Sequence, residues 1–72
     1  MAGLQSHVSL ISIGEALAHE HYARHLWVDH EVLEHTARRA AEKQLGGPVS
    51  DEAIEEILRA YEREWEVVTF AD

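Results

Sequence analysis

The firmest constraint on this chain is the run Gly46-Gly47-Pro48, which no regular helix crosses. Glycine readily adopts the left-handed conformation that caps a helix, and proline lacks the backbone N–H that a continuing helix needs. On both sides of this run most residues are good helix formers, and apolar positions recur every three or four residues. We therefore expect an all-α chain, with helices before and after the stop and none through it.

The stretch after the stop carries the clearer helix pattern. Ser50 is a typical N-cap residue, and the acidic Asp51 and Glu52 favour the positive end of a helix. This pattern predicts a helix over about 51–66. Its apolar stripe consists of six residues at helical spacing: Ala53, Ile54, Ile57, Leu58, Tyr61 and Trp65.

The stretch before the stop has an apolar stripe that Asp29 interrupts. A helix boundary explains the interruption, because Asp29 then becomes an N-cap and Val28 packs on Leu33 as a hydrophobic staple. We therefore expect two helices here, over about 13–27 and 30–45. One unbroken helix of roughly 32 residues is the alternative, and such a length suits a dimer better than a lone small domain.

Both ends of the chain are apolar and rich in β-branched residues. Residues 1–12 contain no Asp, Glu, Lys or Arg, so we expect an extended or disordered segment there. The helical domain then occupies 13–66, and 67–72 forms an apolar and acidic tail that is β-prone and extended. A lone extended segment cannot satisfy its own backbone groups, so these ends favour contact with another chain.

The size of the chain also favours a partner. It has 72 residues and no cysteine, which excludes disulfides, thiolate zinc sites and a cysteine nucleophile. A domain this small buries only about 60% of its unfolded surface and usually gains stability from a disulfide, a metal or a second chain. We therefore expect a partner protein or a homodimer to complete the three-helix core.

The charge is strongly acidic and unevenly distributed. The net charge is −8, and residues 48–72 hold eight acidic and two basic residues, or −6 of that total. An acidic surface repels phosphate backbones and anionic lipid, so we expect neither nucleic acid nor membrane as a direct partner. No apolar run approaches the roughly 20 residues that cross a bilayer, and a cytoplasmic protein is the expectation.

The six histidines suggest the one alternative function. His21 and His25 are one helical turn apart, as are Glu31 and His35, which is the spacing of paired metal ligands. A histidine- and carboxylate-based metal-binding or metal-responsive homo-oligomer is therefore the alternative. No phosphate loop or activated nucleophile is recognisable, so we expect neither an enzyme nor a cofactor.

The favoured interpretation is a non-catalytic protein-binding module. A short acidic helical body with an apolar tail is similar, in shape and charge alone, to inhibitor, antitoxin and small accessory proteins as a loose class. The predicted partner is a larger protein with an apolar groove and a basic rim, attracted by glutamates along the last helix: Glu55, Glu56, Glu62, Glu64 and Glu66. The predicted protein-binding residues are Tyr61, Trp65, Val67, Val68 and Phe70.

Overall fold

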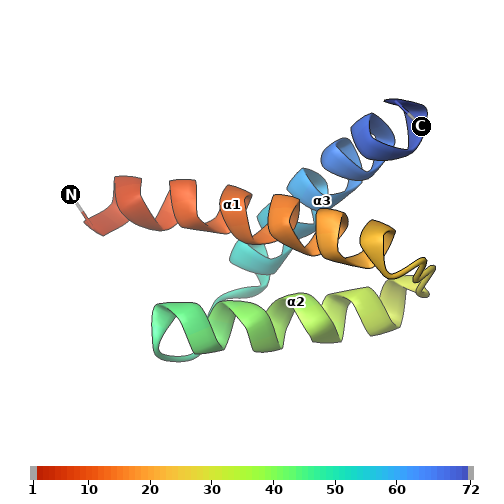
Figure 1. Cartoon of the computed structure of the whole chain (residues 1–72). Coiled ribbons are helices and arrows are strands. Elements are labelled where there is room, and N and C mark those ends of the chain that lie inside the picture. The colour runs from red at the N-terminus through yellow and green to blue at the C-terminus, as the bar shows by residue number, and fades with distance from the viewer. Residues whose placement is uncertain (1, 72) are drawn as a thin grey trace.

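The chain folds into three helices, as the computed structural model shows (Figure 1). The structure describes the backbone of residues 2–71 and the side chains of residues 9–70. Helix α1 spans Ala2–Ala23, α2 spans His30–Leu45 and α3 spans Asp51–Ala71. No strand occurs between residues 2 and 71, which confirms the all-α prediction. In the same part of the chain no helix combines the length and apolar character needed to cross a membrane.

Helices α1 and α3 are longer than predicted. The prediction of an extended or disordered segment over 1–12 is wrong, because α1 begins at Ala2; Met1 lies outside the described residues. The prediction of an extended tail after residue 66 is also wrong, because α3 continues to Ala71; Asp72 is likewise not described. Packing explains the N-terminal difference, since Leu10 and Ile13 are both buried in the core.

Helix α1 ends four residues earlier than predicted, at Ala23. The N–H of Leu26 donates to the carbonyl of His21, and the N–H of His25 donates to the carbonyl of Tyr22. His25 has a φ of +58°, so these two bonds and the left-handed residue form a Schellman motif. Glycine normally fills this position, but histidine is among the residues that tolerate it. The sequence therefore contains a helix stop that carries no glycine.

The core lies where α1 crosses α3. Gly14 sits at the crossing, and a Cβ placed on it would lie 2.4 Å from the carbonyl oxygen of Ile57 and 2.9 Å from the Cβ of Ala60. The absence of a side chain thus lets the two helix backbones touch. Helix α2 completes the core from the other side. The buried apolar residues are Leu10, Ile13, Leu17, Ala18, Leu33, Ala37, Ala41, Ile54, Ile57, Leu58, Ala60 and Tyr61.

Helix α2 has the predicted bounds, so the alternative of one unbroken helix is wrong. Asp29 is its N-cap with extended backbone, and the Asp29 carbonyl accepts a hydrogen bond from the Leu33 N–H. The Asp29 side chain, however, makes no capping hydrogen bond. Val28 packs against the core, in the place expected for the staple. At the other end Gly46 has a φ of +83° and donates to the carbonyl of Glu42, as the helix stop predicts.

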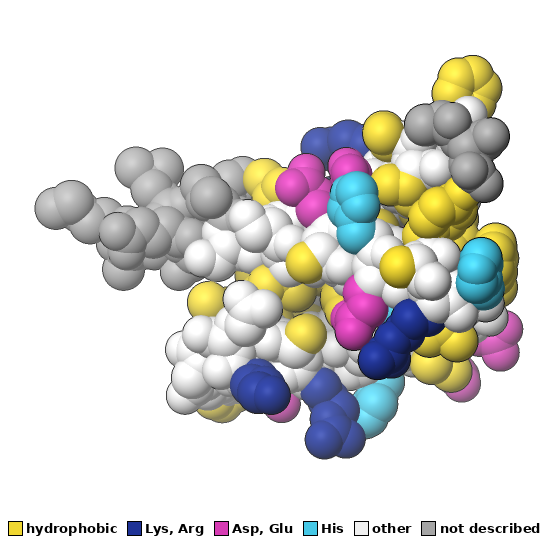
Figure 2. Space-filling model, in the orientation of Figure 1, with side chains coloured by type: hydrophobic (Ala, Val, Ile, Leu, Met, Phe, Trp, Pro, Cys, Tyr) yellow, Lys and Arg dark blue, Asp and Glu magenta, His cyan; other side chains and the backbone are white. Residues whose placement is uncertain are grey.

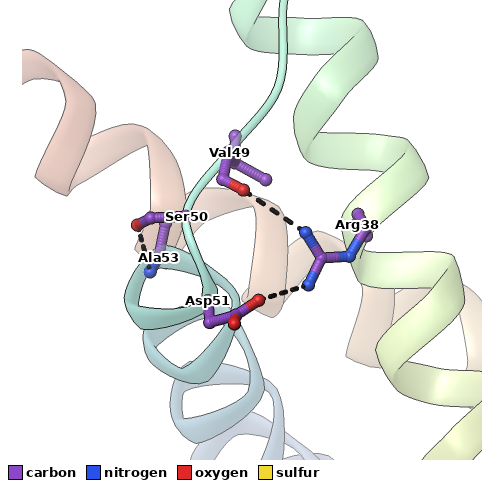
Figure 3. A network of polar contacts seen from close by, with 5 residues as sticks. All are labelled: Arg38, Val49, Ser50, Asp51 and Ala53. Carbon is purple, nitrogen blue, oxygen red and sulfur yellow. Dashed lines mark hydrogen bonds and ion pairs between the residues drawn. The ribbon is translucent and has the colours of Figure 1, made fainter.

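A network of polar contacts fixes the start of α3 against α2 (Figure 3). The hydroxyl oxygen of Ser50 accepts a hydrogen bond from the Ala53 N–H, which confirms Ser50 as the N-cap. Arg38 of α2 donates to the Asp51 carboxylate at 2.8 Å and to the Val49 carbonyl at 3.3 Å. The guanidinium therefore bridges α2 and the first turn of α3 at the surface of the molecule.

Candidate protein-binding surface

An aromatic cluster attaches the second half of α3 to the end of α1 and the following loop. Tyr61 and Trp65 are stacked, with ring centroids 5.8 Å apart and planes 8° from parallel. Trp65 also makes T-shaped contacts with Tyr22 of α1 and Trp27 of the loop, with ring centroids 6.1 Å and 5.5 Å apart. Edge-to-face and stacked pairs add specific geometry to apolar burial. Trp65 is thus the centre of the cluster and holds three segments together.

Two histidines of α1 add polar contacts to this attachment. The Nδ1 of His21 and the hydroxyl of Tyr61 share a hydrogen bond of 2.8 Å, and both side chains are buried. Burial raises the pKa of the Tyr61 hydroxyl above its ordinary value of 10.0. On the surface, the Nε2 of His19 donates to the Glu64 carboxylate at 2.6 Å. These contacts fix the position of α3 relative to α1 at the point where α3 leaves the bundle.

Residues 62–70 of α3 form an end of the helix that we call the α3 tip, and Trp65 on its inner side belongs to the cluster. Figure 1 shows the last turns of α3, after the contacts of Glu64 and Trp65 with α1, rising away from α2 and from the end of α1. Phe70 is 93% exposed and Val67 is 55% exposed, and both line a shallow surface hollow with Arg63. Arg63, Val67 and Phe70 follow one another at i, i+4 and i+7, so they occupy one face of the helix.

The far side of the tip faces the cluster. Val68, three residues after Trp65, is half-buried on this side. Thr69 is also half-buried but lines the same hollow as Val67 and Phe70, and its hydroxyl donates to the Trp65 carbonyl at 2.7 Å within α3. No charged residue occurs in 67–71. A helix turn with apolar residues on several sides is typical of a buried helix. Hydrophobic side chains accordingly gather at the right of the molecule, over the second half of α3 and the α1–α2 loop (Figure 2).

Acidic side chains flank the tip. Glu62 and Glu66 lie one turn apart on the tip, and both are exposed. Glu55, further back along α3, is exposed as well. Glu64 instead pairs with His19, and Glu56 is half-buried and already engaged. Only part of the predicted acidic set therefore remains available to attract a partner.

The five predicted binding residues lie in one half of α3 but on different faces. Tyr61 is buried and Trp65 and Val68 are half-buried, whereas Val67 and Phe70 are exposed. They therefore divide into an inner set that holds α3 on the bundle and an outer pair that points to solvent. Sequence reasoning left Arg63 out of the set, although its i, i+4, i+7 relation to Val67 and Phe70 was readable. Trp27, 67% exposed, adds a further ring beside Trp65.

The histidines are dispersed. Among residues 9–70, no three histidine, aspartate or glutamate side chains lie together as ligands for a metal ion. His21 is bonded to Tyr61 inside the bundle, whereas His25 lies exposed in the left-handed turn. The end of α1 therefore does not bring this helix-spaced pair onto one face. Glu31 and His35 are both exposed on α2.

Comparisons with protein families, with curated proteins and with solved structures find no match to this chain.

Proposed function

We propose that this chain is a non-catalytic protein-binding module that docks on a larger protein through the α3 tip. The exposure of Phe70, 93%, is the observation that carries the proposal. Burying a side chain of this size stabilises by about 1.5–3 kcal/mol, a large share of what so small a domain has in reserve. Exposed apolar surface beside charged residues is characteristic of protein interfaces. A partner that covers Phe70 and Val67 recovers this stabilisation.

The chemistry of the tip also indicates the partner. A preformed helix with exposed anchors at i and i+3 suits an apolar groove. Glu62 and Glu66 lie beside these anchors, so basic residues at the rim of the groove complement them. The net charge of −8 adds long-range attraction to a basic protein and repulsion from nucleic acid or anionic lipid. Inhibitor, antitoxin-like protein and accessory subunit all fit this mode, and the effect on the partner's activity separates them.

Site-specific photocrosslinking tests the proposal. A photoreactive phenylalanine analogue replaces Phe70, and the matched control carries the same group at Glu15, which is exposed on α1. In extracts of the source cells we expect a discrete crosslinked protein from position 70 and none from position 15. Excess unlabelled chain should suppress the product, and Val67→Glu in the labelled chain should weaken it about tenfold or more.

Two results would contradict the proposal. No crosslink at position 70 would mean that the tip binds no protein under these conditions. Crosslinks to the chain itself, with no other protein, would mean that the tip serves self-association alone.

A further inference from the structure

Helix α2 presents a second face that the described part of the chain covers only in part, since Ala40 packs against the core at its edge. Val32, Thr36 and Ala40 form one row along it, four residues apart. Val32 is 49% exposed, and the other two are half-buried and help line an open hollow. Beside them runs a second row of His35, Arg39 and Lys43, all exposed and again four residues apart. We call these two rows the α2 outer face.

The α2 outer face is unusual in an acidic protein because a row of small and apolar residues lies beside a basic edge. The chain has six Lys and Arg residues, and α2 carries three of them: Arg38, Arg39 and Lys43. Arg38 turns toward Asp51 and α3, whereas Arg39 and Lys43 remain exposed. In Figure 2, Lys and Arg side chains accordingly lie along the lower edge of the molecule, over α2.

The α3 tip has the complementary features. It offers Val67 and Phe70 as apolar anchors and Glu62 and Glu66 as exposed negative charges. Each surface also carries one charge of the opposite sign: Arg63 lies on the acidic tip, and Glu42 lines the hollow beside the basic edge of α2. These two charges are complementary to each other as well. The small residues of the α2 row allow a second helix to approach closely, so that a large side chain from that helix fills the hollow.

We propose that the α2 outer face of one copy binds the α3 tip of a second copy. Each copy carries both faces, and in the proposed dimer the contact forms twice, related by a two-fold axis; a contact that forms only once per pair would instead build open chains. The net charge of −8 on each copy opposes association at long range. The molecule is 37 Å long, however, and the Debye length at physiological salt is about 8 Å, so the charges at the contact outweigh the distant ones.

This inference rests on the proposed function in one respect, because it also uses the α3 tip as a binding surface. It goes further by assigning α2 a role and by making the two uses of the tip mutually exclusive. A partner protein and a second copy then compete for Phe70 and Val67. The dimer covers the apolar tip until a partner with a better groove displaces the second copy.

A charge-swap experiment on the full chain tests the contact. The first variant, Arg39→Glu/Lys43→Glu, makes the α2 edge acidic; the second, Glu62→Lys/Glu66→Lys, makes the tip basic. All four residues are exposed, so both variants should keep the wild-type circular dichroism spectrum. Sedimentation equilibrium should show a wild-type dimer, and at least about tenfold weaker self-association for each variant alone. Mixing the two variants should restore the dimer, because both reciprocal contacts then pair opposite charges.

A matched control separates the contact from net charge. Glu15→Lys/Glu20→Lys on α1 changes the net charge as much as the tip variant does, at two exposed residues outside both faces. It should dimerise as well as wild type or better. A monomeric wild type, or a mixture of swapped variants that stays monomeric, would overturn the inference.

The outcome also separates this inference from the proposed function. If Arg39→Glu/Lys43→Glu abolishes the dimer but leaves the crosslink from position 70 to another protein, both hold. If the wild-type chain dimerises but position 70 gives no crosslink to another protein, only the proposed function is contradicted.

Discussion

Substitution of Gly14 by alanine gives the sharpest test of the fold. The new Cβ would lie 2.4 Å from the Ile57 carbonyl oxygen and 3.0 Å from the Tyr61 amide nitrogen, and both are backbone atoms of α3. No side-chain rotation relieves such a contact. Ordinary contact begins near 3.4 Å, so the two helices have to separate by roughly 1 Å.

The energy of this separation exceeds the gain in helix propensity. Alanine is favoured over glycine in a helix interior by about 1 kcal/mol. A gap of 0.5–1 Å forfeits roughly a quarter to a half of the dispersion energy at each contact, and overpacking a core typically costs about 1–3 kcal/mol. Ile13 and Ile57, both fully buried, lie on either side of the crossing. With a rigid backbone as the obstacle, we expect a net loss of about 2 kcal/mol.

Thermal and urea unfolding, followed by far-UV circular dichroism at fixed protein concentration, measures this loss. About 2 kcal/mol corresponds to a fall in Tm of roughly 8–16 °C in a domain this small. The controls are the two other glycines described. Gly47→Ala adds a Cβ in open space and should be nearly neutral, whereas Gly46→Ala, at a φ of +83°, should cost about 1 kcal/mol. A Gly14→Ala protein as stable as wild type would refute the close crossing.

Three further predictions concern the helix ends and the aromatic cluster. His25→Gly should raise stability by about 0.5–1 kcal/mol, because glycine removes the strain of the left-handed φ; a lower Tm would mean that the imidazole itself stabilises the turn. Ser50→Ala should cost about 1 kcal/mol in urea unfolding, and Asp29→Ala roughly half as much or less, since only Ser50 makes a side-chain cap; equal losses would contradict this assignment. The raised pKa of Tyr61 means that its neutral form is favoured in the folded state, so its contribution to stability is complete below pH 10.0 and is lost as the pH rises through the folded-state value. The urea midpoint should therefore fall above pH 10.0, and a midpoint that stays constant there would exclude a buried Tyr61.

Local capping chemistry made α2 and the start of α3 predictable. Asp29, Gly46 and Ser50 mark helix ends in the sequence and occupy helix ends in the structure. The six-residue stripe of α3 was also predictable, since Ile54, Ile57 and the rest recur at helical spacing on a strongly amphipathic segment. These signals lie within a few residues of the feature they specify and do not depend on the rest of the fold.

The ends of α1 and α3 were not predictable from propensity. β-branched residues disfavour a helix by only about 0.5 kcal/mol each, and tertiary packing overrides that preference. In α1 the deciding signal was the spacing of Leu10, Ile13 and Leu17, which places them on one face. In α3 the deciding signal was the spacing of Trp65 and Val68, which lie three residues apart and continue the inner face of the helix. Both signals are weak until the partner helix is known.

The candidate site was only partly predictable for a related reason. The sequence predicted candidate binding residues between 61 and 70, but the prediction assumed an extended tail after residue 66, in which alternate residues share a face. In a helix, Val67 and Phe70 share a face, whereas Val68 turns inward. The close pairing of His21 with Tyr61 depends on the crossing of α1 over α3, which no local pattern contains. The left-handed turn at His25, which ends α1, is likewise not marked by a glycine or proline in the sequence, and it separates His25 from the helical face of His21.

The structure separates the residues that hold the α3 tip from those that present it. Trp65 contacts the rings of Tyr22 and Trp27, which belong to α1 and the following loop, so these contacts attach the tip to the bundle without a partner. A helix that is already formed loses less conformational entropy on binding than a tail that must fold first. Phe70, by contrast, is 93% exposed and has almost no packing to lose. Substitution of Phe70 should therefore leave the fold intact and weaken the proposed binding, whereas substitution of Trp65 should lower both stability and binding.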